Sequence, residues 1–125
     1  MANELILIVE DNEKNRKLVR DVLQFRGYRT LEAETGEDGV RLAREHHPSL
    51  VLMDIQLPGI DGIEALTQLR RDAETRDIPI IAVTASAMTH DRQKILAAGF
   101  DAYQTKPINV REFMTAVERA IEGSR

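Results

Sequence analysis

Acidic, hydroxyl and ammonium side chains lie where four separate apolar runs of the chain end. Glu10 and Asp11 follow the first run, Asp54 follows the third, Thr84 follows the fourth, and Lys106 comes directly after the fifth. If the runs are parallel strands of one sheet, their carboxyl ends meet at the edge where open α/β sheets bind ligands. Three carboxylates gathered there repel one another unless a cation neutralises them or some of them hold protons.

This predicted cluster favours magnesium and phosphoryl transfer. Oxygen ligands without histidine or cysteine suit a hard divalent ion such as Mg²⁺. A cation and a lysine shield phosphoryl oxygens while a carboxylate attacks the phosphorus atom. Asp54 is the expected nucleophile, because it ends the most apolar run and lies between the acid pair and the Thr84–Lys106 side. Its product would be an aspartyl phosphate, an acyl phosphate whose ready hydrolysis suits a timed signal.

Five short runs rich in branched residues are the predicted strands that position these groups. Three of them are apolar throughout, as expected for strands covered on both faces, whereas the second and the last mix polar and apolar residues and are expected at the sheet edges. The runs are 5–9, 28–33, 50–53, 80–83 and 101–105.

Apolar residues at helical spacing fill the stretches between the runs and after the last one. Asn109 and Glu112, with Ile108 before them, have the form of a capping box with a staple, and Gly27 and Gly99 stand where helices should end. Five βα units in series predict an α/β fold, a doubly wound five-stranded parallel sheet with helices on both faces. The expected stripes are Leu18, Val19, Val22 and Leu23; Val40, Leu42 and Ala43; Ile63, Leu66 and Leu69; Ile95, Leu96 and Ala98; and Phe113, Met114, Val117 and Ile121.

Length and composition restrict the class of protein. The 125 residues carry a formal net charge of -4 and no cysteine, which excludes a disulfide scaffold and argues against a bare nucleic-acid binder. No apolar run approaches the ~20 residues of a membrane span, and the first residues do not resemble a signal peptide. We therefore expect one domain over residues 1–125, in the cytoplasm, without direct contact to nucleic acid or membrane.

Four motifs together resemble the receiver domain of bacterial two-component response regulators. They are VEDN at 9–12, LMDIQLPG at 52–59, VTA at 83–85 and TKP at 105–107. The resemblance extends over about residues 5–121. It implies a flavodoxin-like (βα)5 fold with strand order 2-1-3-4-5, in a protein that catalyses only its own phosphorylation and dephosphorylation.

The resemblance also implies a role for each site residue. Asp54 would be the phosphoacceptor, with Mg²⁺ held by Glu10, Asp11, Asp54 and the backbone carbonyl of Gln56. Lys106 would contact the phosphoryl oxygens. The family pattern allows Asp at the position of Glu10, and the longer side chain keeps the charge.

Further residues are implied in switching and in the lifetime of the phosphate. Thr84 would donate its hydroxyl to the phosphoryl group, and Tyr103 would be the aromatic rotamer switch. Gln56 and Ser86, each two residues beyond a site residue, are expected to border the path of the attacking water and to tune hydrolysis.

The implied partners are a histidine kinase or a histidine phosphotransfer domain, which would donate the phosphoryl group from phosphohistidine. A downstream protein would bind the surface formed by the fourth helix, the fifth strand and the fifth helix. Homodimerisation on phosphorylation is left open by the sequence. Exposed candidates there are Met88, Arg92, Arg111 and Arg119.

Other interpretations remain open at this point. The chain resembles single-domain regulators, but a receiver from a hybrid histidine kinase looks similar. A Mg²⁺-dependent phosphatase with an aspartyl nucleophile would want an acid two residues after it, where Gln56 stands. A flavodoxin-like nucleotide binder is disfavoured because Glu10 and Asp11 would repel phosphate, and a docking module that no longer switches is disfavoured because every chemical residue is present.

Histidines and paired cations are interpreted as surface groups. His46, His47 and His90 are expected to be solvated, and the first two end a helix, where a cation suits the helix dipole. Arg16–Lys17 and Arg70–Arg71 are expected on polar helix faces.

Overall fold

The computed structural model describes residues 3–85 and 89–123, with side chains described from residue 92 onward in the second range. Five strands and five helices alternate along this part of the chain. They are β1 Leu5–Val9, α1 Glu13–Phe25, β2 Arg29–Ala33, α2 Gly36–His46, β3 Leu50–Asp54, α3 Gly62–Arg71, β4 Ile80–Thr84, α4 Thr89–Ala98, β5 Ala102–Thr105 and α5 Val110–Gly123.

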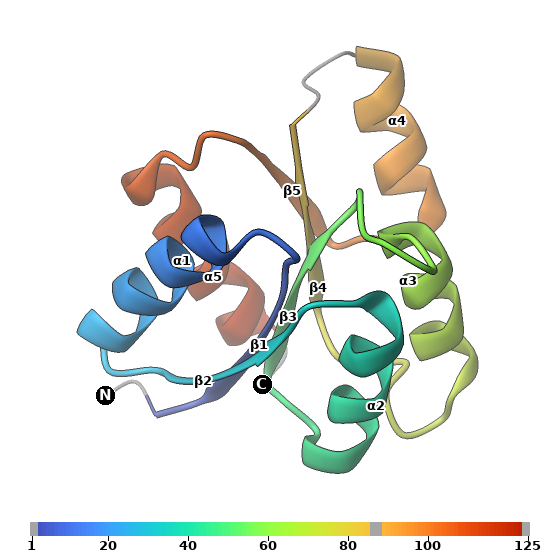
Figure 1. The fold of residues 1–125 in the computed structure, drawn as a ribbon, viewed down its shortest axis with the longest axis horizontal. Helices are drawn as coiled ribbons and strands as arrows, with labels where there is room; N and C mark the ends of the chain where they lie inside the picture. Colours follow the sequence, from blue (N-terminus) through green and yellow to red (C-terminus); the bar gives the residue numbers. More distant parts are fainter. Residues whose placement is uncertain (1–2, 86–88, 124–125) are drawn as a thin grey trace.

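All five strands pair in parallel, in the order β2-β1-β3-β4-β5. The order confirms the expected flavodoxin-like topology, and it confirms that the two mixed runs form the edge strands (Figure 1). Every residue of the central strands β3 and β4 is buried, as their uninterrupted apolar runs predict.

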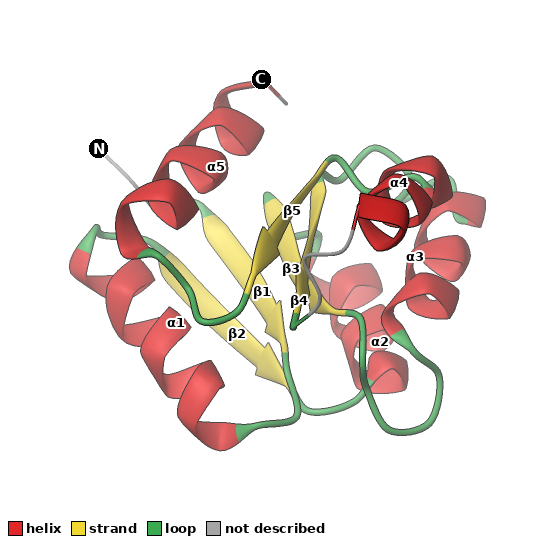
Figure 2. Ribbon diagram, turned by 90° about the horizontal axis from the view of Figure 1, so that it is seen from above, coloured by secondary structure: helices red, strands yellow, loops and turns green. Residues whose placement is uncertain are grey.

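The sheet separates two apolar cores, one under each layer of helices. Side chains alternate along a strand, so in β1 Ile6 and Ile8 pack on the α1–α5 side, while Leu7 and Val9 pack on the other side. Helices α1 and α5 cover one face, and α2, α3 and α4 cover the opposite face (Figure 2). Among the described residues, no helix is long and apolar enough to cross a membrane.

Local capping fixes where the helices begin and end. The side chain of Asn109 accepts from the backbone N–H of Glu112 at 3.1 Å, which is the Asn109 half of the expected capping box. Gly27 and Gly99 follow α1 and α4 with φ of 92° and 117°, values that favour glycine at a helix stop. The cis Lys106–Pro107 peptide lies in the connection between β5 and α5.

Two of the expected helical stripes are only partly correct. In α4, Ile95 is buried, but Leu96 is 44% exposed and Ala98 is exposed as well. Leu96 directly follows Ile95 and so lies on a different face of the helix, whereas Ala98, three positions on, lies near the face of Ile95 and is exposed all the same. In α1, Leu18 is 43% exposed although Val19 and Leu23 are buried.

Candidate functional site

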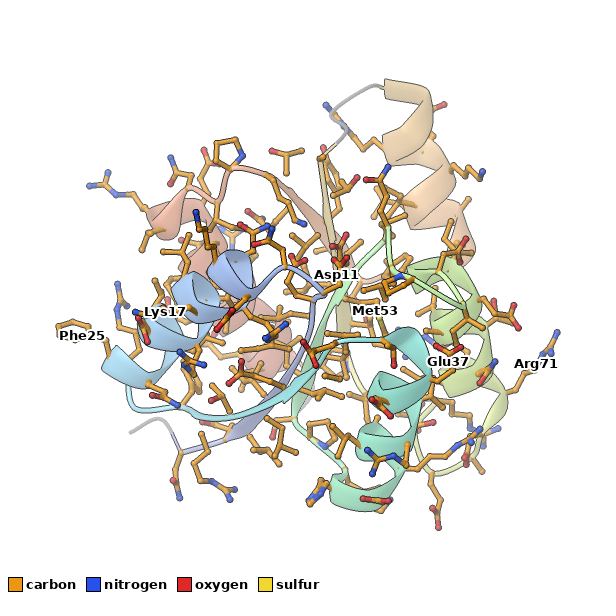
Figure 3. All side chains as sticks on the ribbon, in the orientation of Figure 1. Asp11, Lys17, Phe25, Glu37, Met53 and Arg71 are labelled. Carbon is orange, nitrogen blue, oxygen red and sulfur yellow. The ribbon has the colours of Figure 1, made fainter. Side chains whose placement is uncertain are left out.

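The carboxyl edge of the sheet brings the predicted site residues together. Register pairs Val9 of β1 with Met53 of β3, so the residues that follow them, Glu10 and Asp54, are neighbours at this edge. Asp54 in turn pairs with Val83, directly before Thr84. In the view of Figure 3, Asp11 and Met53 are both drawn near the middle of the molecule.

Three carboxylates form a compact acidic cluster. Glu10, Asp11 and Asp54 each offer one oxygen atom, and these oxygens lie within 4.8 Å of one another. Glu10 and Asp54 are only 5% and 4% exposed, whereas Asp11 is exposed and faces solvent. An oxygen-only set with one open side matches the way Mg²⁺ is bound, with one or two carboxylates and several waters. The residues present therefore fit a magnesium ion.

Lys106 crosses from the end of β5 to two of these carboxylates. Its Nζ lies 2.8 Å from Glu10 Oε1 and 3.0 Å from Asp54 Oδ2. Burial lowers the pKa of Lys106, but the hydrogen bonds and charges of Glu10 and Asp54 outweigh it, so the pKa of the ammonium lies above its ordinary value. The lysine therefore stays charged beside the acids.

The loop after β3 fixes the other oxygen of Asp54. The backbone N–H of Gln56 donates to Asp54 Oδ1 at 3.0 Å, and the N–H of Gly62 donates to the carbonyl of Ile55 at 2.9 Å. A Cβ at Gly62 would lie 2.8 Å from Ile55 Cα, so only glycine lets α3 begin this close to the strand end. Reasoning from the sequence did not identify this close approach of Gly62.

The β4–β5 side of the site is also formed as the motifs predict. Thr84 is 4% exposed, and its carbonyl accepts the backbone N–H of Lys106 at 2.8 Å. Tyr103 is half-buried against the core on the α2–α3–α4 side, and Arg92 Cζ lies 5.4 Å from its ring centroid. This distance is in the range of a cation–π contact between α4 and β5.

The remaining predicted residues lie at the surface or outside the described residues. Gln56, Arg92, Arg111 and Arg119 are exposed. Ser86 and Met88 fall in 86–88, outside the described residues, and the side chain of His90 does too.

Two arginines assigned to polar helix faces are instead tied to the fold, so that expectation was wrong for them. The side chain of Arg16 is 12% exposed and donates to the carbonyl of Glu10, next to the acidic cluster. Arg70, 25% exposed, donates to the carbonyls of Ile78 and Gly99. Arg16 ends the first turn of α1, five residues after Asp11, and side chains of a first helical turn lean back toward the preceding loop, which was the available signal.

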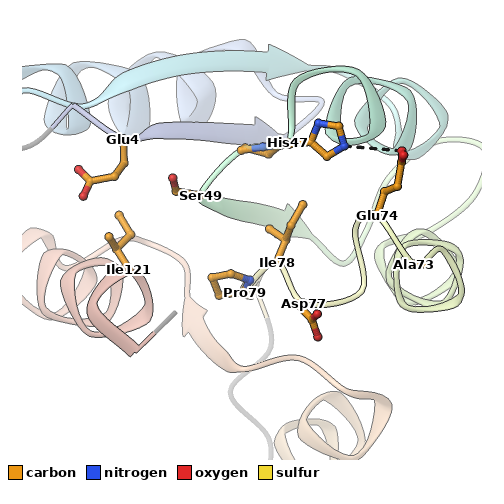
Figure 4. Close-up of a pocket in the computed structure, with 10 residues that line it drawn as sticks. Glu4, His47, Ser49, Ala73, Glu74, Asp77, Ile78, Pro79 and Ile121 are labelled. Atoms are coloured by element: carbon orange, nitrogen blue, oxygen red, sulfur yellow. Dashed lines mark ion pairs between the residues drawn. The ribbon is translucent and has the colours of Figure 1, made fainter. Parts of the chain in front are cut away.

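The opposite edge of the sheet holds a different kind of hollow. A cavity of about 370 Å³ lies where residues such as Glu4, Ser49 and Pro79 precede their strands (Figure 4). His47 Nε2 lies 3.6 Å from a carboxylate oxygen of Glu74 there, and both side chains are more than half exposed. This confirms that His47 is a solvated residue at the end of α2.

Comparison with known proteins assigns the family. The model of the response regulator receiver domain matches residues 6–118. The polar-differentiation response regulator DivK of Brucella ovis is 49% identical over 113 residues, which are 90% of this chain and 92% of that protein.

Solved structures agree. The receiver domain of a sensor histidine kinase from Pseudomonas aeruginosa, solved with a magnesium ion coordinated in the active site cleft, is 36% identical with a TM-score of 0.90, covering 97% of this chain and 99% of that one. A CheY-like receiver domain protein from Methanospirillum hungatei is 28% identical with a TM-score of 0.89, covering 98% and 97%. The chain belongs to the response regulator receiver domains, the signalling modules of two-component systems.

Proposed function

We propose that residues 1–125 form one receiver domain and act as a phosphorylation switch, with Asp54 as the phosphoacceptor. The observation that carries this proposal is the environment of the Asp54 carboxylate. It is buried and ion-paired to Lys106 at 3.0 Å, and one of its oxygens lies within 4.8 Å of an oxygen of Glu10 and of Asp11, close enough to bind one metal ion together. Burying charged groups together costs folding stability, so a functional reason for the arrangement is expected. Phosphoryl transfer would use all of these charges.

The proposed donor is the phosphohistidine of a histidine kinase or of a histidine phosphotransfer domain. An oxygen of Asp54 forms a bond to phosphorus as the phosphorus–nitrogen bond breaks, and the imidazole nitrogen keeps the bonding electrons and takes a proton. Glu10, Asp11, Asp54 and the backbone carbonyl of Gln56 would hold Mg²⁺, which when bound would neutralise charge on the incoming phosphoryl oxygens. Lys106 contributes a second positive charge from the other side.

The proposed readout starts at Thr84. Its hydroxyl donates to the new phosphoryl oxygens, and Tyr103 turns inward. Driving such a two-state element from 1% to 99% active needs a preference of roughly 5.5 kcal/mol. A few charge-assisted hydrogen bonds are in this range. The exposed Arg92 stands over the Tyr103 ring, so this movement would alter the α4–β5–α5 surface.

That surface is the proposed contact for a downstream protein, or for a second phosphorylated copy of this chain. Arg92, Arg111 and Arg119 are its exposed candidates among the described residues. The similarity to DivK, over 92% of that protein, supports a role as a phosphorelay regulator in the cytoplasm. The same chemistry would apply if the receiver were part of a hybrid histidine kinase, and one solved structural relative is the receiver domain of a sensor histidine kinase.

Incubation with a small phosphodonor and Mg²⁺ tests the phosphoacceptor. We expect the intact mass of the wild type to rise by one phosphate and that of Asp54→Asn to stay unchanged. Asp21→Asn is the matched control, because Asp21 is an exposed acid on α1 that pairs with Lys17, far along the chain from Asp54. Phosphate on Asp54→Asn, or none on Asp21→Asn, would count against the proposal.

Gln56 and Ser86 are proposed to set the lifetime of the phosphate. Gln56 is exposed, and its contact to Asp54 comes from the backbone N–H. Its side chain can therefore be replaced without loss of this hydrogen bond. We expect Gln56→Ala to be phosphorylated like the wild type and to hydrolyse at a different rate. Equal hydrolysis rates for Gln56→Ala and Ser86→Ala and the wild type would refute the assignment.

A further inference from the structure

One cation beside the acidic cluster is not explained by phosphoryl transfer. Arg16, on the first turns of α1, has a side chain that is only 12% exposed. Its Nη1 lies 3.0 Å from the carbonyl oxygen of Glu10 and 3.4 Å from that of Asp11. The guanidinium therefore contacts the backbone of both residues whose carboxylates open toward the metal position.

A second strand anchors the other side of this guanidinium. Glu32 lies on the edge strand β2, opposite Ile8 of β1, and accepts from Arg16 Nε at 3.2 Å. Glu34 Oε1 is 3.5 Å from Arg16 Nη1. Arg16 is thus fixed between β2 and the β1–α1 loop, and it does not depend on the loop for its position.

The contacts to the loop act on backbone conformation. A hydrogen bond to each carbonyl restrains the two successive peptide planes, and these planes determine where the Glu10 and Asp11 side chains leave the chain. The remaining described restraints belong to Glu10: its N–H donates to the Ala33 carbonyl, its Oε2 accepts from the Asn12 N–H, and its Oε1 pairs with Lys106. The carbonyl contact from Arg16 is therefore the described side-chain restraint that acts on Asp11.

The charge of Arg16 and its positioning of the loop predict opposite effects of its removal on Mg²⁺ affinity. A positive group near an anionic site repels Mg²⁺, so a purely electrostatic Arg16 would weaken metal binding and its removal would strengthen it. Groups that orient metal ligands have the reverse sign, because their loss weakens binding. The direction of the change thus separates the two roles.

We propose that Arg16 is a positioning residue of the metal site: anchored by Glu32, it holds the Glu10–Asp11 backbone so that both carboxylates face a divalent cation. The inference rests on the magnesium site proposed above. Arg20 supplies a matched control, because its Nη1 also pairs with Glu32, at 3.0 Å, while its described hydrogen bonds reach no carbonyl of the loop.

The test is calorimetric titration of the full chain with MgCl₂, with folding of each variant checked by circular dichroism. We expect Arg16→Gln and Arg16→Lys to raise the Kd for Mg²⁺ by about tenfold, as loss of groups behind metal ligands does, and Arg20→Gln to stay within about twofold of the wild type. Arg16→Lys keeps the charge and loses the planar fork, so it decides the matter even if Arg16→Gln does not fold.

Each outcome bears on the inference. Unchanged or tighter binding by Arg16→Lys would overturn it, as would an equal weakening by Arg20→Gln, since a general charge effect would then suffice. If the wild type itself binds no Mg²⁺, the proposed metal site fails and this inference fails with it. Binding by the wild type together with unaltered binding by both Arg16 variants overturns the inference alone.

Discussion

Helices α5 and α4 lie on opposite faces of the sheet beside β5, yet they are held very differently (Figure 2). In α5, four large residues at helical spacing are buried along one stripe: Phe113, Met114, Val117 and Ile121. In α4, Ile95 is the buried residue among the side chains described from 92 to 98, and Leu96 next to it is half exposed.

The difference indicates which helix can move. Local opening requires least free energy where few apolar contacts are lost, so α4 can shift while α5 keeps its packing. The site lies next to this loosely packed side, because Thr84 ends the strand that leads toward α4. The proposed switch at Asp54 would therefore act through α4 and leave the packing of α5 in place.

Truncation in α5 is expected to have the largest effect on stability. Phe113 is fully buried in the core shared with α1. Phe113→Ala should reduce the free energy of unfolding by about 3–5 kcal/mol, through lost transfer free energy and the cavity left behind. Urea unfolding measures this loss. A loss of stability smaller than that of Ile95→Ala in α4 would contradict the conclusion that α5 is the more firmly packed helix.

Truncation of Ile95, the buried residue among the described side chains of α4, should cost less and act more locally. We expect Ile95→Ala to lower the free energy of unfolding by about 2 kcal/mol, the low end for this change, because one side of the helix is open to solvent. Hydrogen exchange should show faster opening of α4 amides and little change in α5. Equal acceleration in both helices would mean that they unfold as one unit.

The contribution of Lys106, in the connection between β5 and α5, to the stability of the fold should depend on pH. The pKa of Lys106 in the folded protein lies above its ordinary value of 10.5, so its stabilising contribution is complete below about that pH and disappears as the pH rises through the folded-state pKa. Lys106→Met should remove this alkaline component and leave Glu10 and Asp54 without their shared cation, lowering stability at neutral pH. Metal-free denaturation between neutral and alkaline pH measures both effects.

Lys17→Met is the control for this measurement. Lys17 pairs with Asp21 at 2.7 Å, but both side chains are more than half exposed. Its replacement should leave the alkaline profile like that of the wild type. If Lys106→Met keeps the wild-type profile as well, another group causes the alkaline loss.

The smallest effect is expected at Leu96. Because this side chain is 44% exposed on α4, Leu96→Ala should change the free energy of unfolding by no more than about 0.5 kcal/mol. Thermal or urea unfolding checks the value. A large loss would show that α4 is packed more tightly than its exposure indicates, and it would weaken the comparison.

The sheet and the site could be predicted from sequence because their signals are local and repeated. Each strand is a short apolar run, and parallel pairing places the residues at the strand ends together regardless of their separation in the chain. The strand order came from the resemblance to receiver domains and was not worked out from the pattern. For these reasons Glu10, Asp54 and Lys106 meet as expected.

The errors concern residues whose environment depends on distant elements. The apolar residues of α4 are too few and too closely spaced to define a face, so the exposure of Leu96 could not be read from them. Arg16 resembles any surface arginine until Glu32, sixteen residues away, is placed beside it. Gly62 likewise acquires its importance only from the backbone of Ile55 that it contacts.

Direct mapping of the modified residue tests the central claim, that this edge of the sheet makes Asp54 a magnesium-dependent phosphoacceptor. The chain would be treated with a small phosphodonor, and borohydride would then reduce the acyl phosphate to an alcohol that marks its position for peptide mass spectrometry. We expect homoserine at position 54, formed with Mg²⁺ present and lost when a chelator removes it. Reduction at Glu10 or Asp11 in place of Asp54, or undiminished labelling in the chelator, would contradict it.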